Sequence, residues 1–353
     1  MFDIKLFERS VRSAEVTDFA RQLATMVGAH LPLVRCLDIL VQQQSNARFK
    51  NVINDVKQSV SQGDSLSNSL GKHSKIFNRL FVNIIYVGEV SGNLAELLQQ
   101  LANYLEKMSE LKRKLLTAFS YPTVIVFVAI GAISFLLFGI LPTFSEMFEE
   151  FGANMPVATR LLLDGSSFVK DNIFFIMLGL TVCIFIIRFL GKTRKGELFF
   201  HKVQIKAPVL GTVIRKIIIA RFSRTLGILL SSGISLLEAL EITAVSTNNI
   251  PYRNLIVQMK QLTAKGQSIE KSIGDSKLFP PLVIQMIAVG EETAELSAML
   301  GKTAAFYESE VDAAIETLTS IIEPVIIVVL GVVLGGTIIA IYMQIFDLMN
   351  VVH

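Results

Sequence analysis

The chain has no tryptophan and only two cysteines among its 353 residues. Two cysteines cannot build a disulfide framework, and neither Cys36 nor Cys183 has a Cys-x-x-Cys neighbour, so both are expected to be small buried hydrophobic residues. The absence of tryptophan removes the strongest interfacial anchor of membrane proteins. The formal net charge is only +3, so the composition gives no reason to expect a nucleic-acid partner.

Residues suited to catalysis or metal binding are also scarce. Metal-ligand spacing such as His-x-x-x-His is absent among the four histidines, His30, His73, His201 and His353. No Ser-His-Asp or Cys-His arrangement can be supported. Two Gly-Lys-Thr triplets, at residues 191–193 and 301–303, resemble the end of a P-loop, but Ile186 and Leu296 replace the earlier glycine that the loop needs. We therefore expect no catalytic residue, no cofactor and no metal.

The first sixteen residues lack the apolar core of a secretion signal. Residues 1–16 contain Lys5, Arg9 and Arg12 without a hydrophobic run, so a cleavable signal peptide is not expected. The N-terminus is therefore expected to stay in the cytoplasm.

Long hydrophobic segments dominate the rest of the composition, which is 52% hydrophobic and 18% charged. Residues 115–145 and 324–346 carry no charge, and each is long enough to cross a bilayer that needs about 20 residues. The uncharged stretch 172–187 is shorter, but Arg188 can snorkel and Phe189 and Leu190 extend it. Three transmembrane helices are predicted.

Lysine and arginine indicate the orientation of these helices. Basic residues precede the first span and follow the second, at Lys107, Lys112, Arg113, Lys114, Arg188, Lys192, Arg194, Lys195 and Lys202. The segment between the two spans is mostly acidic, with Glu146, Glu149, Glu150, Asp164 and Asp171 against Arg160 and Lys170. Since excess positive charge marks the cytoplasmic side, both large polar regions are expected inside and the connecting loop outside. Alternation then puts the C-terminus outside.

The chain also repeats itself. Phe19-Ala-Arg21-Gln-Leu23 returns 203 residues later (222 − 19) as Phe222-Ser-Arg224-Thr-Leu226. Val87-Gly88-Glu89 and Tyr121-Pro122 return 202 residues later (289 − 87) as Val289-Gly290-Glu291 and Glu323-Pro324. Each copy is a polar region that leads into an apolar segment just after its proline. A repeat of this length indicates a duplicated domain.

Both copies show helical periodicity and few β signals. In the first copy, Thr17 or Asp18 is expected to cap one helix, Pro32 suits the first turn of the next, and Gly63 is expected to end a third over about 47–62. Residues 78–90 and about 94–118 predict two more helices. In the second copy, Ser231-Ser232-Gly233 marks the first turn and Gly266 is expected to end the third helix. Each copy is predicted to be a helical bundle.

The prediction is an all-α protein with duplicated cytoplasmic bundles and three membrane helices. Its expected parts, in order, are a short N-terminal segment 1–16, bundle 1 at 17–112, transmembrane helix 1 at 113–144, an external loop 145–171, transmembrane helix 2 at 172–191, bundle 2 at 192–318, transmembrane helix 3 at 319–346 and an external tail 347–353. The second span has a topological reason, because without it the second copy could not face the same side as the first.

Two motifs leave their role open. Around Gly88-Glu89 and Gly290-Glu291, an apolar helix ends and a new one begins. Either Ser91 or Thr293 caps the new helix, Gly92 relieves the backbone and each glutamate lies near the positive end of that helix, or Glu89 and Glu291 are docking points for a partner. Pro122 and Pro324 mark either helix entry into the membrane or a hinge.

Together these motifs resemble the type II secretion F family, the inner-membrane platform proteins of type II secretion systems, type IV pili and competence pili. The resemblance rests on the paired Phe-x-Arg-x-Leu, Val-Gly-Glu and proline motifs, and on Leu141-Pro142-Thr-Phe144 after the first span. It implies two six-helix cytoplasmic bundles and no enzymatic activity. Many members carry roughly fifty more residues before the first bundle.

The resemblance also implies partners. The bundles would contact a cytoplasmic hexameric traffic ATPase and other inner-membrane assembly proteins, and the membrane helices would receive pilin or pseudopilin segments. A homo-oligomer is expected, with Arg21, Arg224, Glu89 and Glu291 as docking candidates. The alternative is a multi-pass transporter or permease component, which needs ionisable groups within its spans.

Overall fold

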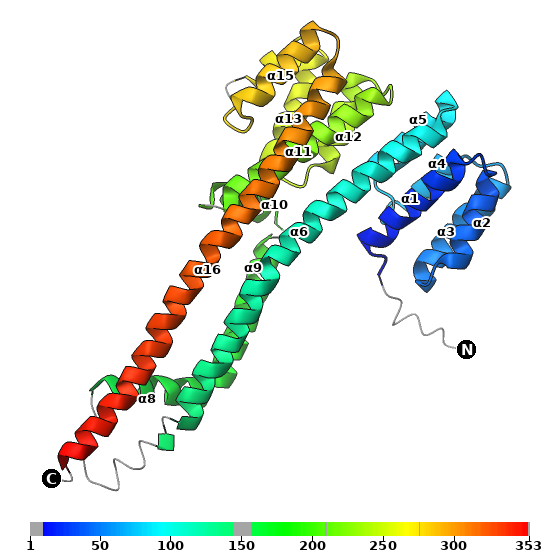
Figure 1. Cartoon of the computed structure of the whole chain (residues 1–353). Helices are drawn as coiled ribbons and strands as arrows, with labels where there is room; N and C mark the ends of the chain where they lie inside the picture. Colours follow the sequence, from blue (N-terminus) through cyan, green and yellow to red (C-terminus); the bar gives the residue numbers. More distant parts are fainter. Residues whose placement is uncertain are drawn as a thin grey trace. The chain divides into compact units, whose positions relative to one another are not determined.

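The computed structural model describes residues 10–140, 142–143, 157–191, 193–208, 210–274 and 276–351 (Figure 1). Every regular element in these ranges is a helix, which confirms the all-α prediction. The chain divides into two compact units: residues 1–114 with 201–312, and residues 115–200 with 313–353. The first unit holds both copies of the polar region, and the second holds the apolar segments.

Bundle 1 contains five complete helices and the beginning of a sixth. These are α1 (Ser13–Gly28), α2 (Leu33–Gln43), α3 (Ala47–Ser61), α4 (Leu66–Gly71), α5 (Arg79–Ser91) and α6 (Leu94–Phe135). Local chemistry fixes several ends: the side chains of Asn46, Ser65 and Asn78 accept backbone N–H groups at the starts of α3, α4 and α5. Gly63, with a φ of 100°, follows α3, as the sequence predicts.

The core of bundle 1 is built around four phenylalanines. Phe19 lies 5.7 Å from Phe49 and 5.6 Å from Phe77, measured between ring centroids, and Phe77 lies 5.0 Å from Phe81. All four are at most 2% exposed. Because these rings come from α1, α3, α5 and the segment before α5, they tie distant parts of the bundle together.

Bundle 2 repeats the order with α11 (Leu210–Ser231), α12 (Leu236–Ser246), α13 (Ile250–Thr263), α14 (Ile269–Ile273), α15 (Pro281–Glu292) and α16 (Leu296–Val351), preceded by α10 (Arg194–Lys206). Phe222 and Phe279 occupy the places of Phe19 and Phe77, with centroids 4.7 Å apart. Tyr252 is fully buried and donates its hydroxyl to Leu278 O at 2.8 Å. Burial raises the pKa of Tyr252 to about 12.

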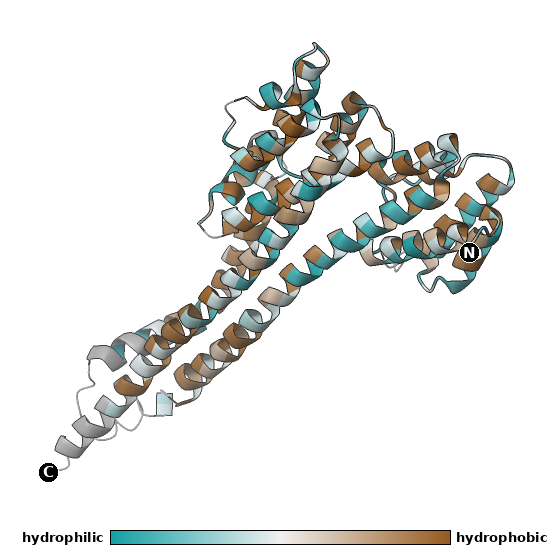
Figure 2. Ribbon diagram, turned by 45° about the horizontal axis from the view of Figure 1, so that its top comes forward, coloured by the Kyte–Doolittle hydropathy of each residue, from teal (hydrophilic) through white to brown (hydrophobic). Residues whose placement is uncertain are grey.

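The second unit contains the apolar parts of α6 and α16, the π-helical turn η2 (Leu136–Ile140), α8 (Val157–Asp171) and α9 (Ile173–Gly191). Three described helices are long and apolar enough to cross a membrane: 94–140, 173–191 and 296–339. Figure 2 shows apolar residues predominating over the C-terminal half of α6. The three predicted transmembrane helices are therefore confirmed by length and composition.

The structure corrects several predicted boundaries. Helix α1 begins at Ser13, just after Arg12, whose backbone N–H donates to the Glu15 carboxylate at 2.7 Å. Thr17 lies inside the helix, and its hydroxyl donates to the carbonyl oxygen of Ser13. Neither Thr17 nor Asp18 is a cap. The short helices α4 and α14 were not predicted, and α8 occupies part of the segment that was expected to be a loop.

Other predictions concern the ends of the long helices. Pro122 and Pro324 lie within continuous helices, so neither breaks its helix. Helix α16 runs from Leu296 to Val351, so it contains the whole of the predicted third span 319–346 and the first five residues of the predicted tail 347–353. Cys36 is buried as expected, whereas Cys183 is exposed on α9. The residues named from the sequence that lie outside the described ranges are Lys5, Arg9, Leu141, Phe144, Glu146, Glu149, Glu150, Lys192 and His353.

The turn before each long helix uses a left-handed residue. Gly92 has a φ of 72°, and its counterpart Ala294 has a φ of 58°. Glycine adopts this conformation freely, whereas a side chain makes it unfavourable by about 1–2 kcal/mol. The second copy therefore carries local strain that the first copy avoids.

We predict that Ala294→Gly stabilises the protein by about 1 kcal/mol and that Gly92→Ala destabilises it by a similar amount. Thermal unfolding of the full chain in nanodiscs, followed by circular dichroism, measures both effects. The control is Ala298→Gly, an exposed position inside α16 where glycine should destabilise. Lower stability for Ala294→Gly would contradict the prediction.

Candidate functional site

The Val87-Gly88-Glu89 motif of bundle 1 lies in the last turns of α5 and contacts two further helices. Glu89, near the end of α5, accepts the backbone N–H of Leu66 at 2.5 Å and that of Ser67 at 3.0 Å. Its carboxylate also accepts the Ser67 hydroxyl at 2.5 Å. These groups lie at the start of α4, where the first turn has N–H groups without helical partners. The carboxylate therefore caps α4 from 22 to 23 residues away along the chain.

Bundle 2 repeats this arrangement. Glu291 accepts the backbone N–H of Ile269 at 2.7 Å and that of Glu270 at 3.1 Å, at the start of α14. The separations are 22 and 21 residues, one fewer than the 23 and 22 of the first copy. A negative charge at the positive end of a helix adds favourable electrostatics to these hydrogen bonds. Since both copies keep the geometry, it belongs to the repeated framework.

The glycine before each glutamate allows close helix packing. A Cβ at Gly88 would lie 3.0 Å from the Cα of Leu94, at the start of α6. A Cβ at Gly290 would lie 2.8 Å from the Cα of Leu296 and 3.3 Å from the Cβ of Met299. Real Cβ atoms essentially never come as close as the 2.8 Å found at Gly290, so a side chain there would force the backbone of Leu296 to move. The 3.0 Å at Gly88 is a tight contact that favours glycine less strictly.

The paired arginines form a second repeated contact. Arg21 on α1 makes two hydrogen bonds to Glu106 on α6, both 2.5 Å long, and a third to Asn103 at 2.6 Å. Arg224 on α11 makes two bonds to Glu308 on α16, at 3.0 and 2.9 Å. Such two-point contacts between a guanidinium and a carboxylate fix orientation as well as distance. Each pair ties the first helix of its bundle to the last.

The two ion pairs differ in their exposure. The side chains of Arg21 and Glu106 are 29% and 45% exposed, whereas Glu308 is only 7% exposed. The hydrogen bonds from Arg21 hold the pKa of Glu106 below its ordinary value. Breaking the second pair would leave a buried charge without its partner, so it should be the more damaging change.

The structure thus gives all four docking candidates internal partners. Docking by Arg21, Arg224, Glu89 and Glu291 remains a prediction, while the capping alternative needs revision. The glutamates cap α4 and α14, not the helices that follow them. Thr293 ends α15 and donates its hydroxyl to Val289 O at 2.8 Å, so it does not cap α16.

Glu106 and Glu308 were missed by the sequence reasoning. They lie 202 residues apart (308 − 106), the same offset as the Val-Gly-Glu and proline motifs, and this offset could have identified them. Their neighbours differ, Leu105 and Lys107 in one copy and Tyr307 and Ser309 in the other, so no motif surrounds them.

Among the described residues, no group of three or more His, Cys, Asp or Glu side chains could hold a metal ion. Gly301, Lys302 and Thr303 lie inside helix α16, where they cannot form a phosphate-binding loop. The sites that the chain repeats are therefore contacts between helices.

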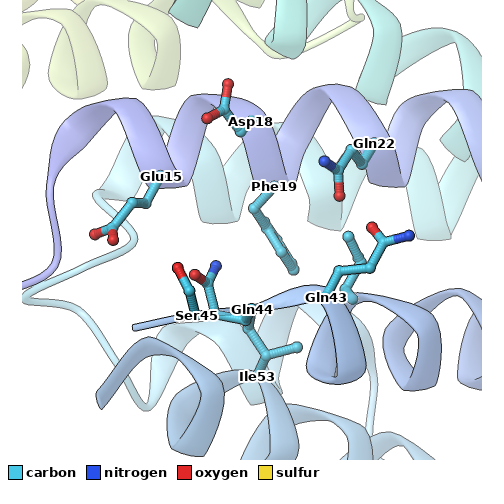
Figure 3. Close-up of a pocket in the computed structure, with 9 residues that line it drawn as sticks. Glu15, Asp18, Phe19, Gln22, Gln43, Gln44, Ser45 and Ile53 are labelled. Atoms are coloured by element: carbon cyan, nitrogen blue, oxygen red, sulfur yellow. The ribbon is translucent and has the colours of Figure 1, made fainter. Parts of the chain in front are cut away.

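A polar groove of about 210 Å³ lies beside the core of bundle 1 (Figure 3). Glu15, Asp18 and Gln22 lie along α1, and Gln43, Gln44 and Ser45 lie across from them at the end of α2. The side-chain NH2 group of Asn46 donates to both carboxylate oxygens of Glu15, each at 3.1 Å. The groove carries two carboxylates and no basic residue, so its surface is acidic.

Comparison with known proteins agrees with the repeat. The family model described as "Type II secretion system (T2SS), protein F" matches residues 19–142 and again residues 222–344. The type IV pilus assembly protein PilC of Myxococcus xanthus is 40% identical over 343 residues, which are 97% of this chain and 82% of the relative. PilC of Pseudomonas aeruginosa is 36% identical, covering 98% and 92%. The type II secretion system protein F of Aeromonas hydrophila is 33% identical, covering 99% and 90%.

We predict that Glu89→Ala and Glu291→Ala each destabilise the protein by about 1–2 kcal/mol, because two N–H groups at a helix start lose their acceptor. Thermal unfolding in nanodiscs measures the effect. The control is Glu292→Ala, an exposed neighbour that should change stability by less than about 0.5 kcal/mol. Equal effects for Glu291→Ala and the control would rule out the capping role.

The Arg21–Glu106 pair predicts a pH dependence. Because the folded-state pKa of Glu106 is lowered, its contribution to stability is fully present above the unfolded-state pKa and is lost as pH falls through the folded value. The stability difference between the wild type and Glu106→Gln should therefore shrink as pH falls from 7 to well below 4.5. Unfolding midpoints across this range test it, and a constant difference would count against the ion pair.

Proposed function

Because the chain belongs to the family of type II secretion system protein F, we propose that it is the inner-membrane platform of a type IV pilus machine. In this role it couples a cytoplasmic hexameric ATPase to the insertion of pilin subunits into a growing fibre. Proteins of this family are structural platform proteins and not enzymes. The relatives with the higher identities reported above are named for pilus assembly, which favours a pilus over a secretion system.

The observation that carries the proposal is the duplication itself. Each copy is a helical bundle whose last helix, α6 or α16, begins in the bundle and continues along the sequence into an uncharged apolar segment. A helix without a break can pass a movement of its bundle to the part of the chain that meets the lipid. Two such units offer a cytoplasmic motor two places to act.

The protein is a multi-pass protein of the inner membrane. We propose that both bundles and the N-terminus face the cytoplasm, and that the segment between the first two spans and the C-terminus lie outside. The distribution of lysine and arginine supports this orientation.

The surface around Glu89 supports its proposed docking role. Tyr86 and Val90, on the same helix, are 55% and 71% exposed. Exposed apolar side chains beside a fixed carboxylate are typical of a protein-binding patch. In bundle 2 the corresponding residues are Ala288 and Glu292, so that surface is smaller and more acidic. The two copies are therefore expected to bind different partners.

We predict that the full chain in nanodiscs captures the pilus-assembly ATPase of its own organism, alone or with its assembly partners. Glu89→Gln removes the charge and places its NH2 group against a donor at the start of α4, so it should weaken capture about tenfold and also lower stability by about 1 kcal/mol. The control is Glu292→Gln.

Capture can be followed by affinity co-purification and by stimulation of ATP hydrolysis. If the wild type captures neither ATPase nor pilin but carries a solute into liposomes, the transporter alternative is correct. Equal capture by the wild type and Glu89→Gln would remove Glu89 from the docking surface while leaving the platform role in place.

A further inference from the structure

The two bundles contact each other inside the first unit. Bundle 1 lines one side of a cavity of about 570 Å³ with eight residues. Ser109 and Lys112 are two of them, and the other six we call groove 1: Ser13, Asn78, Arg79, Tyr104, Leu105 and Met108. Residues of bundle 2 form the other side, and we call them ridge 2: Ile217, Ile218, Arg221, Thr225, Val245 and Asn248. The hydroxyls of Tyr104 and Thr225 are 3.2 Å apart and hydrogen-bonded across the contact. Groove 1 is therefore covered by ridge 2.

The repeat places an equivalent groove on bundle 2. The repeat has an offset of 203 residues at its first motif and 202 at the later ones. Adding 203 to Ser13 and 202 to the other residues of groove 1 gives groove 2: Lys216, Pro280, Pro281, Phe306, Tyr307 and Glu310. These six residues line a separate cavity of about 630 Å³, and all residues around it belong to bundle 2. Phe306, the counterpart of Tyr104, is 46% exposed. Groove 2 thus has the form of groove 1 without a covering ridge.

The repeat also places an equivalent ridge on bundle 1. Shifting ridge 2 back by 203 positions gives ridge 1: Ala14, Glu15, Asp18, Gln22, Gln42 and Ser45. Four of these residues line the acidic groove of Figure 3: Glu15, Asp18, Gln22 and Ser45. Asp18 is exposed and has no hydrogen bond or ion pair with the described part of the chain. Ridge 1 is therefore an open surface.

The two open surfaces carry opposite charge. The cavity at groove 2 is lined by three basic residues, Arg215, Lys216 and Lys277, against one carboxylate, Glu310, which Lys216 already neutralises at 2.7 Å. Lys277 is exposed, and no carboxylate of the described residues pairs with it. Ridge 1 presents Glu15 and Asp18, where ridge 2 has Ile218 and Arg221. The two open surfaces therefore carry opposite charge as wholes, which favours their pairing and disfavours ridge 1 against ridge 1.

We propose that ridge 1 of one chain docks into groove 2 of a second copy of the same chain. The contact repeats between molecules the one that ridge 2 and groove 1 make within a molecule. In each chain the other ridge and groove are already joined, so the open pair is left for neighbours.

The proposed contact is head-to-tail, because the two sides come from different surfaces. Such contacts close into a ring when the rotation allows it and otherwise continue as an open chain. Each bundle leads into an apolar segment at its own C-terminal end, so the repeat keeps one direction toward the membrane. This inference concerns self-association and does not depend on the proposed ATPase partner.

Cysteine cross-linking in native membranes tests the geometry. In a full-length background with Cys36→Ala and Cys183→Ser, Asp18→Cys is placed in a chain with one tag and Lys277→Cys in a chain with another. We expect a disulfide-linked product that carries both tags, and a ladder of oligomers when one chain carries both cysteines. Lys265→Cys, an exposed lysine elsewhere on bundle 2, replaces Lys277→Cys as the matched control.

Two outcomes would overturn the proposal. One is a product between two Asp18→Cys chains in place of the mixed product, which would mean that ridge meets ridge. The other is a mixed product no stronger than that of the Lys265→Cys control.

Charge reversal gives an independent readout. Asp18→Lys and Lys277→Glu should each weaken self-association in nanodiscs by at least about tenfold, measured by energy transfer between labelled chains without any ATPase. The double variant Asp18→Lys, Lys277→Glu restores opposite charges and should recover association. Both side chains are exposed, so all three variants should fold. If the double variant associated as weakly as either single variant, the contact would be contradicted.

Discussion

The carboxylate of each Val-Gly-Glu motif, inside α5 or α15, is the contact that holds the short helix of its bundle. Glu89 and Glu291 hold the first turns of α4 and α14, which have only six and five residues and are too short to be stable alone. The preceding glycine lets the start of the long helix pack closely against α5 or α15. Two consecutive residues thus join three helices at one point.

The sequence predicted the framework better than its contacts. The repeat and the apolar segments were sufficient for the all-α class, the duplication and three membrane helices, because these depend on periodicity and composition. The partners of Glu89 were not predictable, since α4 is too short to show a helical period and lies 22 residues away. Arg21 was found through its motif, but Glu106 was not, because its neighbours differ between the copies. Contacts between distant segments require the fold.

The polar groups of the apolar segments argue against a conducting path. Thr123, Thr181 and Thr337 donate their hydroxyls to carbonyl groups of their own helices, at 2.7, 2.7 and 2.8 Å. Such bonds satisfy the hydrogen of each hydroxyl within its own helix. Residues 115–140 and 324–339 also carry no Asp, Glu, His, Lys or Arg side chain that could relay an ion or a proton. This is the behaviour expected of a platform that other hydrophobic segments approach.

The two copies share their internal contacts and differ at their surfaces, and this contrast explains why both are present. The Arg–Glu pair, the glycine and the capping glutamate recur with the same geometry. The surface positions diverge in charge, as Asp18 and Arg221 show. Two identical bundles would offer identical ridges and grooves, so any of them could pair with any other. Because ridge 1 is acidic while ridge 2 is apolar and basic, the proposed contact with the basic groove 2 suits ridge 1 and disfavours ridge 2. Divergence on a constant framework thus turns a duplicated domain into two surfaces with distinct neighbours.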